Sequence, residues 1–247
     1  MIVIKSNAQI QLMRKAGQAV MRTLELLERY VRPGVTTLEL DKIAHDFIKS
    51  KGGHPSFLGY RGYPASINTS INEEIVHGVP SLRKLKNGDI VGIDIGVYLN
   101  GVHGDAARTY GVGEISEKDQ HLIDVARQCF FESIKHARAK NHLNQICSSI
   151  EAYANSHGYT VSREFIGHGI GTDLHEAPDI PNHSMGKRGP RMRSGMTFAI
   201  EPMINAGKAE AIVLKDGWTG ITKDKKNSAH YENTILITDG EPEILTV

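Results

Sequence analysis

Apolar residues recur with helical spacing in four stretches of the chain, and residues suited to capping a helix precede most of them. In the first stretch, Ile10, Met13 and Leu24 fall on one face, and Ser6 or Asn7 can cap its N-terminus. The pattern predicts four helices, from Asn7 to about Tyr30, from Thr36 or Thr37 to just before Gly52, from Ser116 to about Ala139, and from Leu143 to about His157.

Segments rich in β-branched residues fill the intervals and predict strands at about residues 66–110, 196–204, 211–214 and 231–238. Two helices followed by strands therefore occur twice, with an offset of about 105 to 110 residues. We expect one α+β domain over residues 1–247, built from two related halves. A cleft between such halves is a common place for a binding site.

One hairpin has a register that its turn sequence sets. Asn-Gly is the strongest short hairpin signal, and here it stands at Asn100 and Gly101. A two-residue loop pairs Leu99 with Val102, Tyr98 with His103, Gly96 with Asp105 and Asp94 with Ala107. Asp94 and Asp105 are then diagonal neighbours on one face, with Cα atoms about 7 to 8 Å apart. Their carboxylates can share cations spaced about 3.5 to 4 Å apart.

Two strand aspartates can also be ordinary solvated residues, and a bulge would turn one of them to the opposite face. Gly92 and Gly96 flank Asp94 on its own face and add no bulk there. These glycines favour a ligand site over a solvated face.

The segment from Ile166 to Pro178 places His168 and His175 among three glycines. Glycine permits close approach of the backbone, and neutral imidazole can bind a metal or carry protons near neutral pH. A single histidine is usually structural, whereas two in such a loop favour a function.

Glu201 and Glu232 stand in or beside apolar strand-forming segments. A buried carboxylate needs a partner or a metal to offset its desolvation. Several carboxylates with one imidazole suit Mn, Fe, Co or Zn and not a structural zinc site made of thiolates.

Bulk properties exclude several classes of protein. Lys plus Arg is 29 and Asp plus Glu is 28, so the net charge of +1 does not favour nucleic acid as a main ligand. No segment approaches the ~20 apolar residues of a membrane span. Cys129 and Cys147 both fall in predicted helices, which disfavours a disulfide and favours a cytoplasmic protein.

Six motifs, taken in order, resemble the type I methionine aminopeptidases, metallopeptidases of the pita-bread fold, in which a curved antiparallel sheet is covered by helices. They are Asn72 to Pro80, Ile93 to Gly96, His103 to Asp105, Gly167 to Pro178, Ala199 to Met203, and Glu232 to Thr234. The resemblance covers the whole chain. It implies removal of the N-terminal methionine from nascent proteins and peptides, with a preference for a small second residue.

The resemblance also assigns the site residues. It implies that Asp94, Asp105, His168, Glu201 and Glu232 bind two divalent cations, with Mn, Fe or Co expected and Zn also accepted. Glu201 would take a proton from the attacking water, and His77 and His175 would contact the substrate. The walls of the methionine pocket would be Phe57, Tyr60, Tyr63, Asn68, Phe198 and Trp218.

Two positions depart from the pattern of many bacterial members of that family. Asn68 stands where a cysteine is frequent, and His230 stands where glutamine is frequent. The first change places an amide near the pocket, and it makes the preference for methionine a point to test.

Two alternatives remain open. An X-Pro aminopeptidase or prolidase would share the fold and the ligands, but usually carries an additional N-terminal domain, and a non-catalytic binding protein would be expected to lose ligands. Type II methionine enzymes carry a long insertion where only 25 residues separate His175 from Glu201.

The expected partners are nascent polypeptides that begin with methionine and the ribosome surface, through basic residues such as Lys187, Arg188, Lys225 and Lys226.

Overall fold

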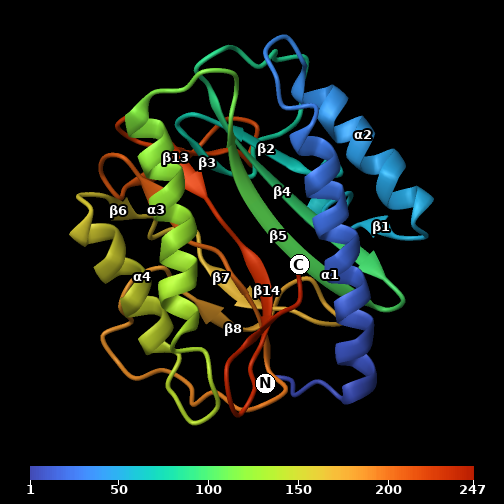
Figure 1. Ribbon diagram of the computed structural model, residues 1–247, viewed down its shortest axis with the longest axis vertical. Helices are drawn as coiled ribbons and strands as arrows, with labels where there is room; N and C mark the ends of the chain where they lie inside the picture. The colour runs from blue at the N-terminus through green and yellow to red at the C-terminus, as the bar shows by residue number, and fades with distance from the viewer.

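The structure, a computed structural model, describes all residues from 1 to 247. Four helices form two pairs, one on each side of the strands in Figure 1. They are α1 (Asn7–Glu28), α2 (Thr37–Ser50), α3 (Glu117–Ile134) and α4 (Asn144–Ser156), and a short 3-10 turn, η1, spans Tyr60–Gly62. The four predicted helices are therefore confirmed.

Side chains define the starts of three of these helices. Ser6 caps α1 and Thr36 caps α2, each in a reciprocal capping box with the residue three positions on. Ser116 caps α3 by accepting a hydrogen bond from the backbone N–H of Asp119 at 3.1 Å. This helix ends at Ile134, before the predicted end at Ala139. The N–H groups of His136 and Ala137 bond to carbonyls three residues back, and the Ala139 N–H bonds to the Thr238 carbonyl.

Fifteen strands form four small antiparallel sheets. The first half contributes β1 (His54–Pro55), β2 (Asn68–Ile71), β3 (Glu74–Val76), β4 (Ile90–Leu99) and β5 (Val102–Gly111). The second half contributes β6 (Thr160–Val161), β7 (Gly167–Gly169), β8 (Glu176–Ile180), β9 (Thr197–Ile200), β10 (Met203–Asn205), β11 (Ala211–Val213), β12 (Gly220–Thr222), β13 (Ser228–His230), β14 (Asn233–Leu236) and β15 (Glu243–Ile244).

The hairpin of β4 and β5 has the predicted register. Asp94 is paired with Ala107 and Gly96 with Asp105, and no bulge interrupts the ladder. Asn100 and Gly101 have φ values of 53° and 89°, the positive pair that a type I′ turn requires. The turn therefore places both aspartates on one face of the ribbon.

The opposite face of that ribbon packs against helices. Val91, Ile93, Ile95 and Val97 are buried in a cluster with residues of α1 and α2. A second cluster joins α3 and α4 to β9, β10, β13 and β14. Each helix pair thus covers the outer side of one group of strands and leaves the inner sides, where the two halves face each other, for the candidate ligands.

The spacing of elements supports the two-half interpretation. Helix α3 begins at Glu117 and α1 at Asn7, an offset of 110 residues, while α4 begins at Asn144 and α2 at Thr37, an offset of 107 residues. Strand β9 begins 107 residues after β4. The same order of elements at nearly the same offset gives the molecule its two pseudo-symmetric halves.

Two predicted strands are interrupted at the residues that matter most. The expected strand at 196–204 breaks between Ile200 and Met203, and the segment near Glu232 breaks between His230 and Asn233. Pro202 cannot donate to a ladder, and the Glu232 N–H bonds to the Ala107 carbonyl of β5 at 3.0 Å. Both glutamates therefore lie at strand breaks, not within continuous strands.

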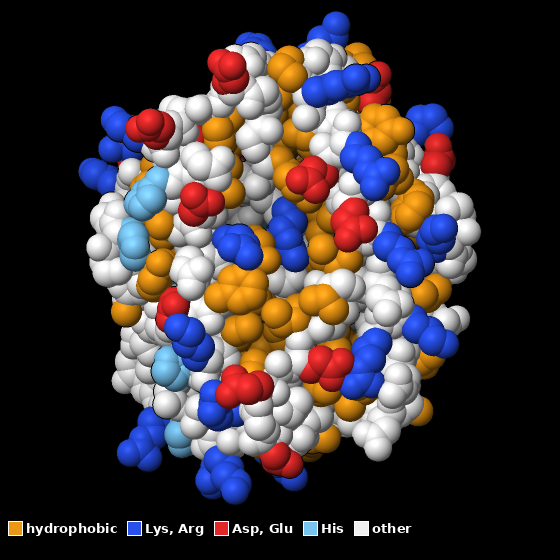
Figure 2. All heavy atoms as spheres, in the orientation of Figure 1, with side chains coloured by type: hydrophobic (Ala, Val, Ile, Leu, Met, Phe, Trp, Pro, Cys, Tyr) orange, Lys and Arg blue, Asp and Glu red, His pale blue; other side chains and the backbone are white.

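The visible surface carries both signs of charge. In Figure 2 the Lys and Arg side chains are interspersed with Asp and Glu over the whole face, in keeping with the net charge of +1. None of the helices has the length and apolar character needed to cross a bilayer.

Candidate metal centre and active site

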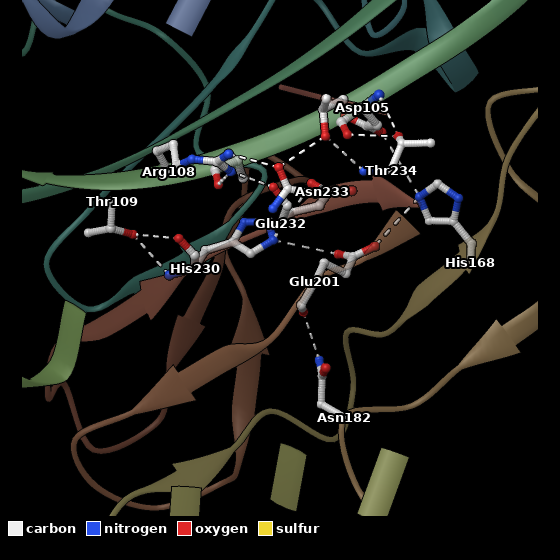
Figure 3. Close-up of polar contacts among 12 residues, drawn as sticks. Asp105, Arg108, Thr109, His168, Asn182, Glu201, His230, Glu232, Asn233 and Thr234 are labelled. Carbon is white, nitrogen blue, oxygen red and sulfur yellow. Dashed lines mark hydrogen bonds and ion pairs between the residues drawn. The ribbon is translucent and has the colours of Figure 1, made fainter. Parts of the chain in front are cut away.

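Five acidic and imidazole side chains from both halves meet between the sheets. Asp94 lies on β4, Asp105 on β5 and His168 on β7. Glu201 directly follows β9, and Glu232 directly precedes β14. Figure 3 shows four of them turned toward one another. The ligand atoms of Asp105, His168 and Glu232 all lie within 4.8 Å of one another, and His168 Nε2 is 3.5 Å from Glu201 Oε1.

Side chains fix the backbone positions in the cluster, and those of Thr234 and Arg108 bridge the two halves. Thr234 Oγ1 accepts a hydrogen bond from the Asp105 N–H at 3.0 Å and donates one to the Asp105 carbonyl at 2.9 Å. Arg108 donates to the Glu232 carbonyl at 2.5 Å, and Asn182 donates to the Glu201 carbonyl at 3.1 Å. The ligand-bearing segments of β5, β9 and β14 are thereby held in place (Figure 3).

Several polar atoms of the cluster are buried without a hydrogen-bond partner. They include Asp94 Oδ1, Asp105 Oδ1 and Glu232 Oε1. Burial without a partner is costly for a carboxylate, and native proteins leave few such atoms unsatisfied. Oxygens buried in this way are suited to binding a cation.

The pKa values reflect the same cost of burying carboxylates. Burial raises the pKa of Asp94 to about 7, and burial together with the neighbouring carboxylates raises the pKa of Asp105 and of Glu232 well above the ordinary range. Burial also raises the pKa of Glu201, whereas it lowers the pKa of His168 to about 4. Without a cation these buried carboxyl groups cannot all ionise. Together with a neutral imidazole they form the donor set of a divalent cation site.

Glycines allow the segment that bears His168 to approach its neighbours. A Cβ on Gly167 would lie 2.5 Å from the Ala199 carbonyl oxygen, and one on Gly169 would meet the carbonyl oxygen of Ala177. The structure thus explains the glycines around His168 by close backbone packing of β7 against β8 and β9.

A pocket of about 260 Å³ opens onto the cluster. Its lining includes all five candidate ligands, together with Phe57, Tyr60, Tyr63, Asn68, His77, His175 and Trp218. Further lining residues, none of them expected as a site residue, are Arg61, Val76, Glu164, Phe165 and Ile166. The structure thus gathers residues from segments that lie far apart in the chain around one cavity.

Aromatic contacts fix the two pocket histidines. The ring of His175 stacks on Tyr60 with centroids 5.1 Å apart, and its Nδ1 lies 2.9 Å from the Tyr60 hydroxyl. His77 packs edge-on against Phe165 at 5.6 Å. Tyr63 in turn meets Trp218 edge-on at 5.2 Å and donates a hydrogen bond to the Gly78 carbonyl at 3.0 Å.

Phe198 does not line this pocket. Side chains alternate along β9, and Phe198 joins Ile200 in the buried cluster beneath α3 and α4, on the side away from the ligands. Leu174, directly before His175, is instead buried with Phe57 and Tyr63 behind the pocket. The sequence signal for this position is the apolar residue directly before the second histidine.

Gly96, beside Asp94, has a different role from the one expected. A Cβ on Gly96 would lie 2.7 Å from Ser56 Cβ and 2.9 Å from Phe57 Cε1. The absence of a side chain at Gly96 therefore makes room for Phe57, a wall of the pocket, and does not directly leave space for a ligand.

Comparison with known proteins agrees with this geometry. Residues 11–239 match the sequence description of metallopeptidase family M24. The chain belongs to metallopeptidase family M24. Divalent metal binding by the buried cluster is in keeping with membership of M24.

Relatives named methionine aminopeptidase match along their full length. The methionine aminopeptidase of Clostridium perfringens is 50% identical over all of this chain and 99% of its own length, and methionine aminopeptidase 1 of Bacillus subtilis is 46% identical over 100% and 99%. The crystal structure of methionine aminopeptidase from Rickettsia prowazekii superposes with a TM-score of 0.98 at 42% identity, with both chains fully covered.

Solved structures of lower sequence identity share the fold alone. Prolidase from Pyrococcus furiosus has a TM-score of 0.79 at 23% identity, and the match covers 99% of this chain but 65% of that one. The pita-bread fold expected from the motifs is therefore confirmed.

Proposed function

We propose that this chain is a metal-dependent aminopeptidase that removes the N-terminal methionine from nascent proteins and peptides. The observation that carries the proposal is a buried cluster of four carboxylates and one imidazole, with unpaired oxygens, at the base of an aromatic pocket. Full-length relatives named methionine aminopeptidase support the same activity. The whole of residues 1–247 would act as one catalytic domain.

The proposed ligands are Asp94, Asp105, His168, Glu201 and Glu232, which would hold two divalent cations, with Mn, Fe or Co preferred and Zn accepted. Their oxygens and imidazole nitrogen fit such cations because several of them are buried and unpaired. Bound divalent cations make water a stronger acid and polarise a carbonyl group.

Glu201 would act as the general base and acid. Its carboxylate lies 3.5 Å from His168 and reaches the pocket, where it can accept a proton from the attacking water. The same carboxyl group then returns the proton to the leaving amine, so the group ends the reaction as it began.

His175 would stabilise the charge that develops on the scissile carbonyl oxygen. His175 Nδ1 lies 2.9 Å from the Tyr60 hydroxyl. In the proposed tautomer this hydroxyl would donate to Nδ1, and the proton of His175 would stand on Nε2, where it can be donated to that carbonyl oxygen. His77, held by Phe165, would orient the peptide beyond the scissile bond.

The pocket walls would select methionine. Phe57, Tyr60, Tyr63 and Trp218 provide aromatic surface, and a thioether gains about 0.3 to 1.5 kcal/mol from each such contact. Asn68, paired with Asp94 across β2 and β4, adds the amide that distinguishes this pocket. A small second residue would be preferred, and Phe198 has no part in the wall because it is buried elsewhere.

The reaction would take place in the cytoplasm, where nascent chains begin with methionine. Cys129 and Cys147 are free and buried, as is usual in a reducing compartment. Exposed Lys187, Arg188, Lys225 and Lys226 would contact the ribosome. Co-sedimentation with ribosomes that survives charge reversal at these four residues would remove that part of the proposal.

The activity can be tested on two tripeptides. Metal-free protein, reloaded separately with Mn, Fe, Co or Zn, is expected to release methionine from Met-Ala-Ser and to leave Ala-Pro-Ala intact. Glu201→Ala serves as the inactive control. Cleavage of Ala-Pro-Ala alone would assign the chain to the proline-specific branch, and no cleavage with any metal would support a non-catalytic role.

A further inference from the structure

His230 lies beside the metal centre, but is not one of its five assigned ligands. Its side chain is 4% exposed, and its Nε2 is buried without a hydrogen-bond partner. Native proteins rarely bury a polar ring nitrogen without a partner. An unpartnered nitrogen directed at two carboxylates therefore needs an explanation.

The distances from His230 to these carboxylates match those of His168. His230 Nε2 is 3.8 Å from Glu201 Oε2 and 3.9 Å from Glu232 Oε2. His168 Nε2 is 3.5 Å from Glu201 Oε1 and 4.0 Å from Asp105 Oδ2. Glu201 therefore stands between two imidazoles, with one oxygen directed at each, as Figure 3 shows.

These separations are too long for hydrogen bonds, which extend to about 3.2 Å between nitrogen and oxygen. They suit atoms that bind a common cation. Ligand atoms that each lie about 2.0 to 2.2 Å from one cation are separated from each other by roughly 3 to 4 Å, depending on the coordination angle.

The backbone holds His230 in this orientation. Its N–H donates to Thr109 Oγ1 at 2.9 Å, and its carbonyl accepts from the same hydroxyl at 2.9 Å. Within β10 and β13, His230 is paired with Met203, two residues beyond Glu201. The strand that carries the ring is therefore tied both to β5 and to the segment that carries Glu201.

We propose that His230 is a further ligand of the metal centre and supplies a second imidazole across Glu201 from His168. This inference rests on the proposed function, because it uses the same carboxylates. Imidazole suits Zn, Fe and Co, whereas Mn favours oxygen ligands, so His230 shifts the preference of one cation position away from Mn.

The test measures metal binding directly, with Co²⁺ as the probe. Calorimetric titration of the metal-free chain gives the affinity of each site, and X-ray absorption of the Co-loaded protein gives the number of imidazoles bound. His230→Gln retains a side-chain N–H donor but removes the imidazole. His157→Ala removes an exposed imidazole as the matched control, and circular dichroism verifies that each variant is folded.

The wild-type chain is expected to bind two Co²⁺ ions through two imidazoles in all. His230→Gln is expected to lose one imidazole and to weaken one binding step by roughly tenfold or more, since even indirect partners of ligands affect affinity by about 10 to 100-fold. His157→Ala should behave as wild type. Unchanged affinities and an unchanged imidazole count in His230→Gln would overturn the assignment.

The same samples separate this inference from the proposed function. If the wild type binds Co²⁺ through two imidazoles but releases no methionine from Met-Ala-Ser, the ligand assignment stands and the aminopeptidase proposal fails. If the wild type releases methionine while His230→Gln binds Co²⁺ unchanged, the aminopeptidase proposal stands and the ligand assignment fails. A wild type that binds no Co²⁺ overturns both.

Discussion

Single residues decide how the pocket meets the metal centre. Gly92 and Gly96 lie on the same strand and the same face, on either side of Asp94. A Cβ on Gly92 would find ordinary contact distances of 3.6 Å or more, whereas one on Gly96 would lie 2.9 Å or less from Ser56 and Phe57. Only Gly96 is required by the pocket wall.

We therefore expect Gly96→Ala to displace Phe57 and raise the KM for Met-Ala-Ser, with a loss of stability of about 1 to 3 kcal/mol from overpacking. Gly92→Ala is the matched control and should leave KM near the wild-type value. Steady-state kinetics with urea unfolding check both. Equal KM values in the two variants would show that Gly96 does not shape the pocket.

Phe198 and Leu174 show what sequence reveals about individual residues. The alternation of side chains in β9 could have placed Phe198 with Ile200, on the face opposite the ligands. An aromatic side chain alone does not indicate which core it joins. The place of Leu174 could not be predicted locally, because its burial depends on Phe57 and Tyr63, which come from a distant segment.

At the scale of elements, the N-terminal arm, residues 1–6 before α1, holds the segment that carries His175 in place. Lys5 Nζ lies 2.5 Å from Glu176 Oε2, and the two side chains are 1% and 7% exposed. Lys5 also occupies the space next to Gly171, and its N–H donates to the Gly195 carbonyl at 2.7 Å. The arm therefore fastens the loop between β7 and β8.

Lys5→Met should lower the free energy of unfolding by about 3 to 5 kcal/mol, because it leaves the Glu176 carboxylate buried without its cation. Lys42→Met removes an exposed ion pair with Asp46 and should change stability by less than about 1 kcal/mol. Urea denaturation measures both. Similar small effects in the two variants would mean that the Lys5 pair contributes nothing to stability.

Local sequence signals predicted the elements better than they predicted long-range contacts. The register of the β4–β5 hairpin followed from Asn100 and Gly101, since the turn type sets the pairing. The strand break at Glu201 had a signal in Pro202, which cannot join a ladder. No local sequence signal indicated the pairing of Lys5 with Glu176, because a contact between residues 171 positions apart depends on the whole fold.

For the whole molecule, the metal centre is where the two halves are joined. Thr234 bonds to Asp105 across the halves, and Glu232 bonds to Ala107. The motifs indicated which residues would act, but the distances among them follow from how the halves pack, which periodicity does not reveal. The cations would then offset the repulsion among carboxylates from both halves.

Metal removal should make stability depend on pH. Folding raises the pKa values of Asp105, Glu201 and Glu232 well above those of the unfolded chain. As pH rises, these carboxyl groups ionise at a lower pH in the unfolded chain than in the fold. The metal-free fold therefore loses stability as pH rises from the unfolded pKa values to the folded ones. Burial lowers the pKa values of the site histidines His77, His168, His175 and His230, so they are neutral in the fold above pH ~7 and add little to the slope.

The metal-free protein should therefore have a lower Tm at pH 8.5 than at pH 7, whereas the Co-loaded protein should not, because a cation favours the ionised carboxylates. Scanning calorimetry at the two pH values measures this. A Tm of the metal-free protein that rises between pH 7 and pH 8.5 would contradict the raised pKa values.

The most direct test of the central claim is the intact mass of a protein substrate that begins Met-Ala, after incubation with the Co-loaded chain. We predict that it loses one methionine residue and nothing more, that chelation of the metal prevents the loss, and that Glu201→Ala abolishes it. A substrate mass that stays unchanged with the loaded wild-type chain, or a loss that continues past the first residue, would contradict the account.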